Sequence, residues 1–406
     1  MTLLIALLAL TLPPADSPQP VPQEAWQLTL PDAIRIGLDN SEVVRVITAG
    51  AQAAPVGGFE PEAVPARDPR ITIARLNADA SIWTFKDSIM AHVRSVEQQY
   101  WALAQQRATL QGRETAVRLI DEIRQQAQVD LKAERIKPEA LAEAEQALQN
   151  ARLNLVTATS DLITVERQLR NILGLPAADN RRIVPATAAT EAKQTPDWDQ
   201  SLQQMVAESP SIAQQREILA AACLREAIGG APTDDPARLH SQSERQQSTL
   251  RQVVGEAKHT LARFFLEVDA NFKQFETARR LAGSARERLE DQRAAYDRRE
   301  IPIDRLLDAV SQSANATSQE AEFKYSYNTT IAAFEEARGT LLAVDKITVI
   351  PGPASAATPT PVAPPAPTAP KAAQAETFKV HALVGGYRLI DVEVQRVISP
   401  AAIAPK

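Results

Sequence analysis

The chain has 406 residues, a formal net charge of -6 and only 4% aromatic residues, and its pI lies near 5.5. No cluster of Lys and Arg is interleaved with aromatic side chains, so we do not expect a nucleic-acid-binding face. Only 14 residues are Gly, and Ala, Gln, Glu, Arg and Leu dominate residues 86–345, which favours long helices packed through small side chains over a sheet-rich globule.

The chain opens on a short apolar segment. Leu3 to Leu12 form an apolar run that is too short to cross the ~30 Å hydrocarbon core of a bilayer as a helix. Two prolines and the small residues Ala15 to Ser17 follow, which is the order of a secretory signal peptide, although no Lys or Arg precedes the run. We therefore predict that residues 1–17 are a signal peptide and that the protein is exported, with a plain terminal strand or helix as the alternative.

The first repeat, assigned to residues 18–197, begins with a short amphipathic helix. Leu30, Ile34 and Leu38 stand at a helical interval within the segment from Leu28 to Val46. A loose stretch containing Pro and Gly follows, and a strand-like alternation then runs over residues 71–85. This order predicts a short helix and a connector with a strand before the long helices begin.

Two long helices follow, over residues 86–133 and 139–173. In the first, apolar residues recur every seven positions, and the second carries five unbroken heptads of the same kind. We predict that this regularity forms the seam of an antiparallel coiled-coil hairpin, whose small residues allow close approach. The seam positions of the second helix are Leu141, Ala144, Leu148, Ala151, Leu155, Ala158, Leu162, Val165 and Leu169.

The second half of the chain repeats the first. A shift of 165 residues aligns Ile136, Leu141 and Ala144 with Ile301, Leu306 and Ala309. A period this long indicates a duplicated domain rather than a solenoid unit. We assign the second repeat to residues 198–349, with a short opening helix, a loop over residues 223–245 and a helical hairpin over 247–298 and 303–345.

The C-terminal part has a different composition. A stretch rich in Pro, Ala and Thr predicts an extended linker over residues 350–375. In the tail, residues 376–406, apolar residues alternate on both sides of Gly385 and Gly386, which is typical of a β-hairpin.

The opening helix and the two hairpin tips resemble those of the TolC-type outer-membrane efflux proteins, over about residues 26–345. The segment from Leu38 to Val43 is similar to the family's Leu-x-Asn-Asn-Pro-Glu-Leu ending. The first tip, Glu134 to Leu141, resembles the family's Gly-x-Ile-Ser-Pro-x-Asp-Leu turn and keeps its Ile and Pro. The second tip, Glu300 to Leu307, keeps Ile, Pro, Asp and Leu.

The resemblance implies a homotrimer in which long helices form a periplasmic tunnel and strands form an outer-membrane barrel. It also implies that the tips close the tunnel and contact a periplasmic adaptor of an inner-membrane transporter. The family inserts two barrel-length strands before each long hairpin, whereas this chain offers only residues 43–50 and 71–85 in the first copy and no clear strand in the second. The expected fold is therefore all-α dominated, with two tandem antiparallel coiled-coil hairpins, short equatorial helices and few or no strands of such a barrel.

Polar residues at the tips are the candidates for tunnel gating or adaptor contact, because charges repeated around a constriction dominate its field. The alternative is that they only solvate a turn. These candidates are Arg135, Lys137, Pro138, Glu139, Arg299, Glu300, Pro302, Asp304 and Arg305.

No residue pattern indicates catalysis. The four histidines lack the spacing of metal ligands, and the many carboxylates fall at solvent-facing helix positions, so we predict no enzyme activity, no metal and no cofactor. The expected function is that of an exported efflux-duct subunit of the outer membrane and periplasm. The rival is a soluble periplasmic coiled-coil scaffold. An adaptor protein is a third option, but it would carry a single hairpin beside a lipoyl-like β domain.

Overall fold

The computed structural model describes residues 25–41, 69–176, 181–229, 235–347, 378–384 and 387–394. The expected signal peptide, the expected strand over residues 43–50 and the expected linker over 350–375 lie outside these residues. In chain order the elements are β1 (Ala25–Leu28), α1 (Leu30–Asn40), α3 (Pro69–Lys132), α4 (Pro138–Ile172), β2 (Arg182–Pro185), α5 (Trp198–Glu208), α6 (Pro210–Ala227), α7 (Pro236–Asp297), α8 (Ile303–Arg338), α9 (Leu341–Val344), β3 (Phe378–Val384) and β4 (Tyr387–Val394).

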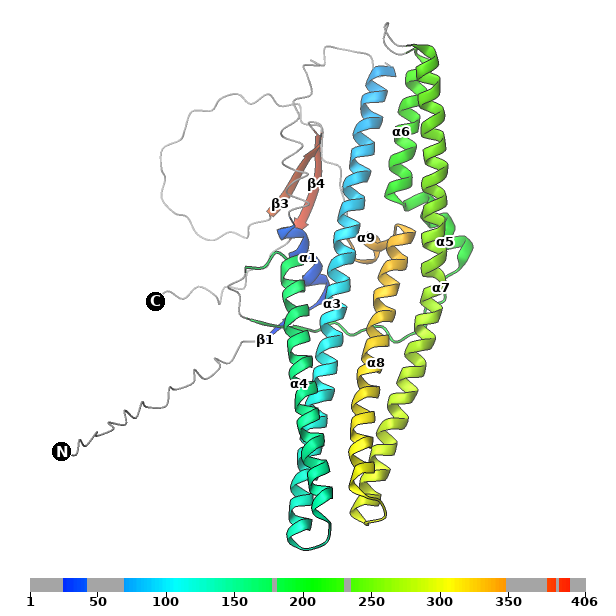
Figure 1. Cartoon of the computed structure of the whole chain (residues 1–406). Helices are drawn as coiled ribbons and strands as arrows, with labels where there is room; N and C mark the ends of the chain where they lie inside the picture. Colours follow the sequence, from blue (N-terminus) through cyan, green and yellow to red (C-terminus); the bar gives the residue numbers. More distant parts are fainter. Residues whose placement is uncertain are drawn as a thin grey trace, which may run out of the picture.

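Two long antiparallel hairpins dominate the molecule, which confirms the predicted fold class. Helices α3 and α4 form the first hairpin, and α7 and α8 form the second (Figure 1). The hairpins lie side by side in one row in the order α4, α3, α8, α7, so α4 and α7 are the flanks (Figure 1). At 64 residues, α3 is about 96 Å long, and its upper half packs against α6, which lies between α3 and α7.

The strand predicted over residues 71–85 is wrong, because this segment is the first part of α3. It contains neither Pro nor Gly, so nothing interrupts the helix that begins at Pro69. Its apolar residues Ile71, Ala78, Ile82 and Phe85 are also spaced by three, four or seven positions, as on one helix face. The helical spacing, and not the short alternation, therefore corresponds to the conformation of this segment.

The loop predicted over residues 223–245 is also wrong for most of its length. Helix α6 continues to Ala227, and α7 begins at Pro236, eleven residues before the predicted start at 247. The side chain of Asp235 caps α7 by accepting a hydrogen bond from the Ala237 amide at 3.0 Å. The start was missed because this part of α7 is polar: between residues 236 and 246 only Leu239 and Ser243 are buried.

The two short helices α1 and α5 repeat one another closely. Each has 11 residues and follows a cap, Thr29 or Asp197, whose side-chain oxygen accepts a hydrogen bond from the amide three residues later. Each ends at a serine, Ser41 or Ser209, in extended backbone. The duplication read from the sequence therefore extends to the local hydrogen bonds.

Three buried clusters form the core. The largest joins α3, α4, α8 and α9 to α1 and the strand pair at the middle of the molecule, the second lies between the hairpins near their tips, and the third belongs to the second repeat. Within the seam of α4, Ala144, Leu148, Ala151, Ala158, Leu162 and Leu169 are buried, and Leu141, Leu155 and Val165 are half-buried. None of the described helices combines the length and apolarity needed to cross a bilayer.

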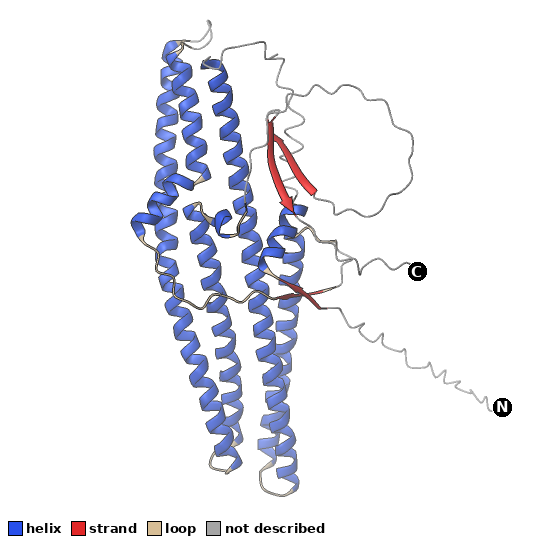
Figure 2. Cartoon of the chain, turned by 180° about the vertical axis from the view of Figure 1, so that it is seen from behind, coloured by secondary structure: helices blue, strands red, loops and turns tan. Residues whose placement is uncertain are grey.

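A non-helical segment, residues 182–197, crosses the helices at mid-height, and we call it the belt (Figures 1 and 2). It begins with β2, which pairs in parallel with β1. The Tyr100 hydroxyl donates to the Leu28 carbonyl at 3.0 Å and accepts from the Thr187 amide at 2.9 Å. The belt is thus fixed to α3 by a buried tyrosine.

The same belt is fixed to α8 further along. The Tyr327 hydroxyl accepts from the Gln194 amide at 2.8 Å and donates to the Ala192 carbonyl at 2.9 Å. The Asn328 side chain both accepts from and donates to the backbone of Thr190, at 2.8 and 3.1 Å. Because buried backbone groups need partners, these side chains fix where the belt crosses each hairpin.

The C-terminal strands β3 and β4 pair antiparallel from Phe378 opposite Val394 to Val384 opposite Tyr387. This is the hairpin that the alternation in the tail indicates. A shift in register occurs between Ala382 and Leu383.

Candidate functional site

The two hairpin tips have the same backbone geometry. Helix α3 ends at Lys132 and α7 at Asp297, and two residues later Glu134 and Arg299 have left-handed φ values of 54° and 63°. These two residues are 165 positions apart, which is the offset of the sequence repeat.

Both helices end in the same pair of hydrogen bonds. After α3, the Glu134 amide donates to the Leu131 carbonyl at 2.9 Å and the Arg135 amide to the Asp130 carbonyl at 2.8 Å. After α7, the corresponding bonds run from Arg299 to Tyr296 at 2.8 Å and from Glu300 to Ala295 at 2.9 Å. This is the pattern of a Schellman motif. Pro138 is then the first residue of α4, whereas Pro302 is the N-cap residue just before α8.

Glycine should fit these turns better than the residues present. We expect Glu134→Gly and Arg299→Gly each to raise the free energy of unfolding by about 1 kcal/mol, because only glycine adopts a left-handed φ without a Cβ penalty. Chemical denaturation followed by circular dichroism measures the change. The control is Glu143→Gly at an exposed position inside α4, which should lower stability by about 1 kcal/mol. Loss of stability in all three variants would contradict the tip geometry.

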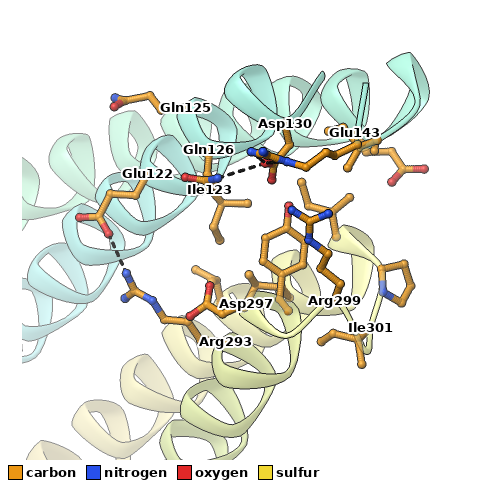
Figure 3. A pocket seen from close by; sticks show the side chains of 18 of the residues that line it. Glu122, Ile123, Gln125, Gln126, Asp130, Glu143, Arg293, Asp297, Arg299 and Ile301 are labelled. Atoms are coloured by element: carbon orange, nitrogen blue, oxygen red, sulfur yellow. Dashed lines mark hydrogen bonds and ion pairs between the residues drawn. The ribbon is translucent and has the colours of Figure 1, made fainter. Parts of the chain in front are cut away.

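A groove of about 1340 Å³ lies between the two tips. Its apolar lining includes Ile123 of α3, Leu289 of α7 and Ile303 of α8. Glu122, Asp130, Arg293, Asp297 and Arg299 add polar side chains from both hairpins (Figure 3). The groove therefore has an apolar base and a charged margin, which suits an amphipathic partner.

Ion pairs hold the groove residues in place. Glu122 of α3 and Arg293 of α7 join the two hairpins at 3.4 Å (Figure 3). Asp130, only 9% exposed, accepts hydrogen bonds from Arg135 Nε at 2.8 Å and from the side-chain Nε2 of Gln126 at 3.3 Å. The first pair is solvent-exposed and contributes little to stability, whereas the second orients a buried carboxylate at the turn.

Tyr296 faces the same groove. Its hydroxyl oxygen is buried and has no hydrogen-bond partner among the described residues. Burial raises the pKa of the Tyr296 hydroxyl, and the negative charge of Asp130 raises it further. The hydroxyl therefore stays protonated and keeps an unused hydrogen-bond donor beneath the groove.

The predicted tip residues divide into two sets. Arg135, Lys137, Glu139, Arg299 and Pro302 line the groove, and all five are exposed. The others do not line it: Pro138, Glu300, Asp304 and Arg305. A surface hydrogen bond from the Arg298 guanidinium, at 2.9 Å, lowers the pKa of the Glu300 carboxyl.

Sequence reasoning missed the residues within the helices just before each turn: Glu122, Asp130, Arg293 and Tyr296. A signal was present, because Ala116, Ile120, Ile123 and Ala127 follow a four-three-four spacing whose next position is Asp130. A charged residue at an otherwise apolar seam position marks a site where a partner charge is required.

The described residues contain no group of three or more His, Cys, Asp or Glu side chains that could hold a metal ion. What the groove offers is a set of hydrogen-bond donors and acceptors beside apolar surface. This arrangement suits non-covalent binding.

No family model matches the sequence, and no curated protein matches it. Solved structures do match the fold. The structure of CusC, a protein that undergoes conformational changes on folding and transmembrane channel formation, is 15% identical with a TM-score of 0.61, and the match covers 79% of this chain and 97% of that chain. The Campylobacter jejuni CmeC outer-membrane channel is 13% identical with a TM-score of 0.56, covering 77% of this chain and 86% of that one. The Neisseria gonorrhoeae MtrE outer-membrane channel in its open state is 12% identical with a TM-score of 0.55, covering 77% and 89%.

The chain has the fold of these outer-membrane channels. The resemblance to the TolC-type family is thereby confirmed at the level of the fold. The match takes in most of each of these chains, so the likeness in fold extends over both hairpins.

Proposed function

We propose that the chain is one subunit of a trimeric duct of the periplasm and outer membrane, which exports small molecules or proteins and is not an enzyme. In this proposal it works with a periplasmic adaptor and an inner-membrane pump. The observation that carries the proposal is the open row of four helices, because both of its flanks present apolar residues that no other described residue of the chain covers.

The α4 flank carries a second apolar stripe in addition to its seam. Leu153, Val156 and Ile163 are 66%, 66% and 45% exposed. They are spaced by three and seven residues, as in a coiled-coil seam, on a face turned away from the residues that pack against α3. Such a stripe favours contact with another helix.

The α7 flank is also partly apolar. Leu266 and Leu281 are 68% and 52% exposed and lie about four turns apart. The two flanks are different surfaces, so a contact between α4 of one copy and α7 of the next would be heterologous. Heterologous contacts that close by rotation generate a ring, and the likeness in fold to outer-membrane channels supports a ring of three.

The tips are the proposed control point. In a ring, the groove and its charged residues would recur around the axis at the narrow end, where repeated charges set the field. We infer that Arg135, Lys137, Glu139, Arg299 and Pro302 contact the adaptor or the neighbouring subunit there. The remaining tip residues form the rest of the two turns and add to the charge of the tips: Pro138, Glu300, Asp304 and Arg305.

Size measurement of the full chain tests the proposal. In detergent, light scattering should give three times the chain mass of 44.1 kDa. The double variant Leu153→Glu with Val156→Glu should give single chains that keep their helical circular dichroism, because two charges would be buried unpaired in the contact. The control is Asn150→Glu with Asn154→Glu, which adds the same charge to exposed positions of α4 outside the stripe and should still form trimers.

Two outcomes would contradict the proposal. One is a chain that stays monomeric and dissolves without detergent, which would favour a periplasmic coiled-coil scaffold. The other is a trimer that is unaffected by the stripe variant, since the contact would then lie elsewhere.

A further inference from the structure

Helix α9 closes the second repeat onto the first. Its residues Leu341 and Leu342 are only 1% and 3% exposed, and they belong to the buried cluster around α3. The chain reaches this position through Gly339 and leaves through Asp345 and Lys346. The contact between α9 and α3 therefore links the end of one hairpin to the core of the other.

Two carboxyl groups meet at this contact. Glu97 of α3 is only 6% exposed, and its carboxyl group hydrogen-bonds to that of Asp345, directly after α9. A hydrogen bond between two carboxyl groups requires a proton on one of them, because two carboxylates have only acceptors. The Oδ2 atom of Asp345 is buried and has no hydrogen-bond donor from another group among the described residues.

The nearest charges make their hydrogen bonds and ion pairs with groups other than Glu97 and Asp345, although Arg94 Nε is buried without a hydrogen-bond partner among the described residues. Glu335 of α8 accepts from Arg338 at 2.7 Å and from the Thr340 hydroxyl at 2.6 Å. Arg94 of α3 lies 3.8 Å from Glu336, which in turn faces Asp87. Within the described part of the chain, no salt bridge reaches Glu97 or Asp345.

Together, burial and these charges favour the state in which Glu97 and Asp345 share one proton. Burial raises the pKa of Glu97 to about 9, with the Asp345 carboxyl, its hydrogen bond and Glu335 adding to the shift and Arg94 opposing it. Burial likewise raises the pKa of Asp345. A carboxyl whose pKa is higher in the folded chain takes up a proton on folding, so its contribution to stability is fully present at acidic pH and declines as pH rises from the unfolded value of 4.5 towards 9.

We propose that Glu97 and Asp345 form a proton-dependent clasp between α3 and α9. While they share one proton, the clasp is closed and α9 stays on α3. When both groups are charged, their repulsion at a buried contact loosens α9. The clasp does not depend on the proposed duct function, because it lies within one chain.

The pH dependence of melting tests the clasp in the full chain. We expect the wild-type melting temperature to fall between pH 5 and pH 9, and that of Glu97→Gln to stay nearly constant, since the amide donates the hydrogen bond without a titrating proton. At pH 8 the Glu97→Gln variant should melt higher than the wild type by roughly 3–6 °C. At pH 4.5 the two should melt together. The control Glu145→Gln, at an exposed position of α4, should keep the wild-type slope.

A second variant and a local readout keep the test decisive. Asp345→Asn also removes one titrating group and should weaken the pH dependence, but less than Glu97→Gln, because it leaves a buried Glu97 charge. Amide hydrogen exchange, corrected for its intrinsic pH dependence, should show faster exchange in residues 341–347 at pH 9 than at pH 6 in the wild type only. Equal slopes in wild type and Glu97→Gln, or exchange in this segment that ignores pH, would overturn the clasp.

Discussion

Gly339→Ala is expected to lower the free energy of unfolding by about 3 kcal/mol or more. Gly339 has a left-handed φ of 80°, which disfavours any residue with a Cβ. An added Cβ would lie 2.6 Å from the carbonyl carbon of Glu208 and 2.8 Å from the Ser209 nitrogen. Both are backbone atoms at the junction of α5 and α6, so they cannot move aside as a side chain can, and α9 would be displaced from α3.

A matched control for Gly339 lies in the same chain. Gly255, inside α7, has no atom within 4 Å of an added Cβ. Gly255→Ala should therefore raise the free energy of unfolding by roughly 0.5–1 kcal/mol, because alanine favours helix. Chemical denaturation followed by circular dichroism compares the two variants. Equal effects of both substitutions would show that the close approach of Gly339 to Glu208 does not exist.

Leu148→Ala is expected to cost about 2–5 kcal/mol, because Leu148 is buried between the hairpins and its removal leaves a cavity. It is 3% exposed and belongs to the cluster that joins α3, α4 and α8 near the tips. The measurement is chemical denaturation under conditions where the chain is monomeric.

Leu153, five residues further along the same helix, provides the comparison. It is 66% exposed, so Leu153→Ala should change monomer stability by less than about 0.5 kcal/mol. Light scattering of the assembled protein should show the opposite ranking of the two positions. There, Leu153→Ala should weaken the trimer more than a conservative substitution of Leu148 does. A loss of monomer stability as large as that of Leu148→Ala would mean that the stripe already has a partner within the chain.

The features that the sequence predicted best are those that repeat at a regular spacing over many residues. The α4 seam extends over five heptads, and the 165-residue offset places Glu134 and Arg299 at the same backbone conformation in the two tips. Both patterns depend on local spacing summed over many residues, so single exceptions do not hide them. The fold class could therefore be read without any structural information.

The features that were missed depend on tertiary contacts. Residues 71–85 show both a short alternation and a helical spacing, and packing of α3 against α6 accompanies the helical choice. The belt has no periodicity at all, and its position depends on Tyr100, Tyr327 and Asn328, which lie far away in the sequence. The pairing of Glu97 with Asp345 joins residues 248 positions apart, so no local pattern could reveal it.

The belt also fixes the point about which a hairpin would tilt if it moved. Its hydrogen bonds to α8 are concentrated at Tyr327 and Asn328, and the tip of that hairpin, at Ile303, lies about 36 Å further along the helix. If the part of the α7–α8 hairpin below the belt tilted about this point by about 5°, its tip would move about 3 Å. Such a tilt would separate Glu122 from Arg293 and open the buried cluster between the hairpins near their tips, while the hydrogen bonds of Tyr327 at the belt would be kept.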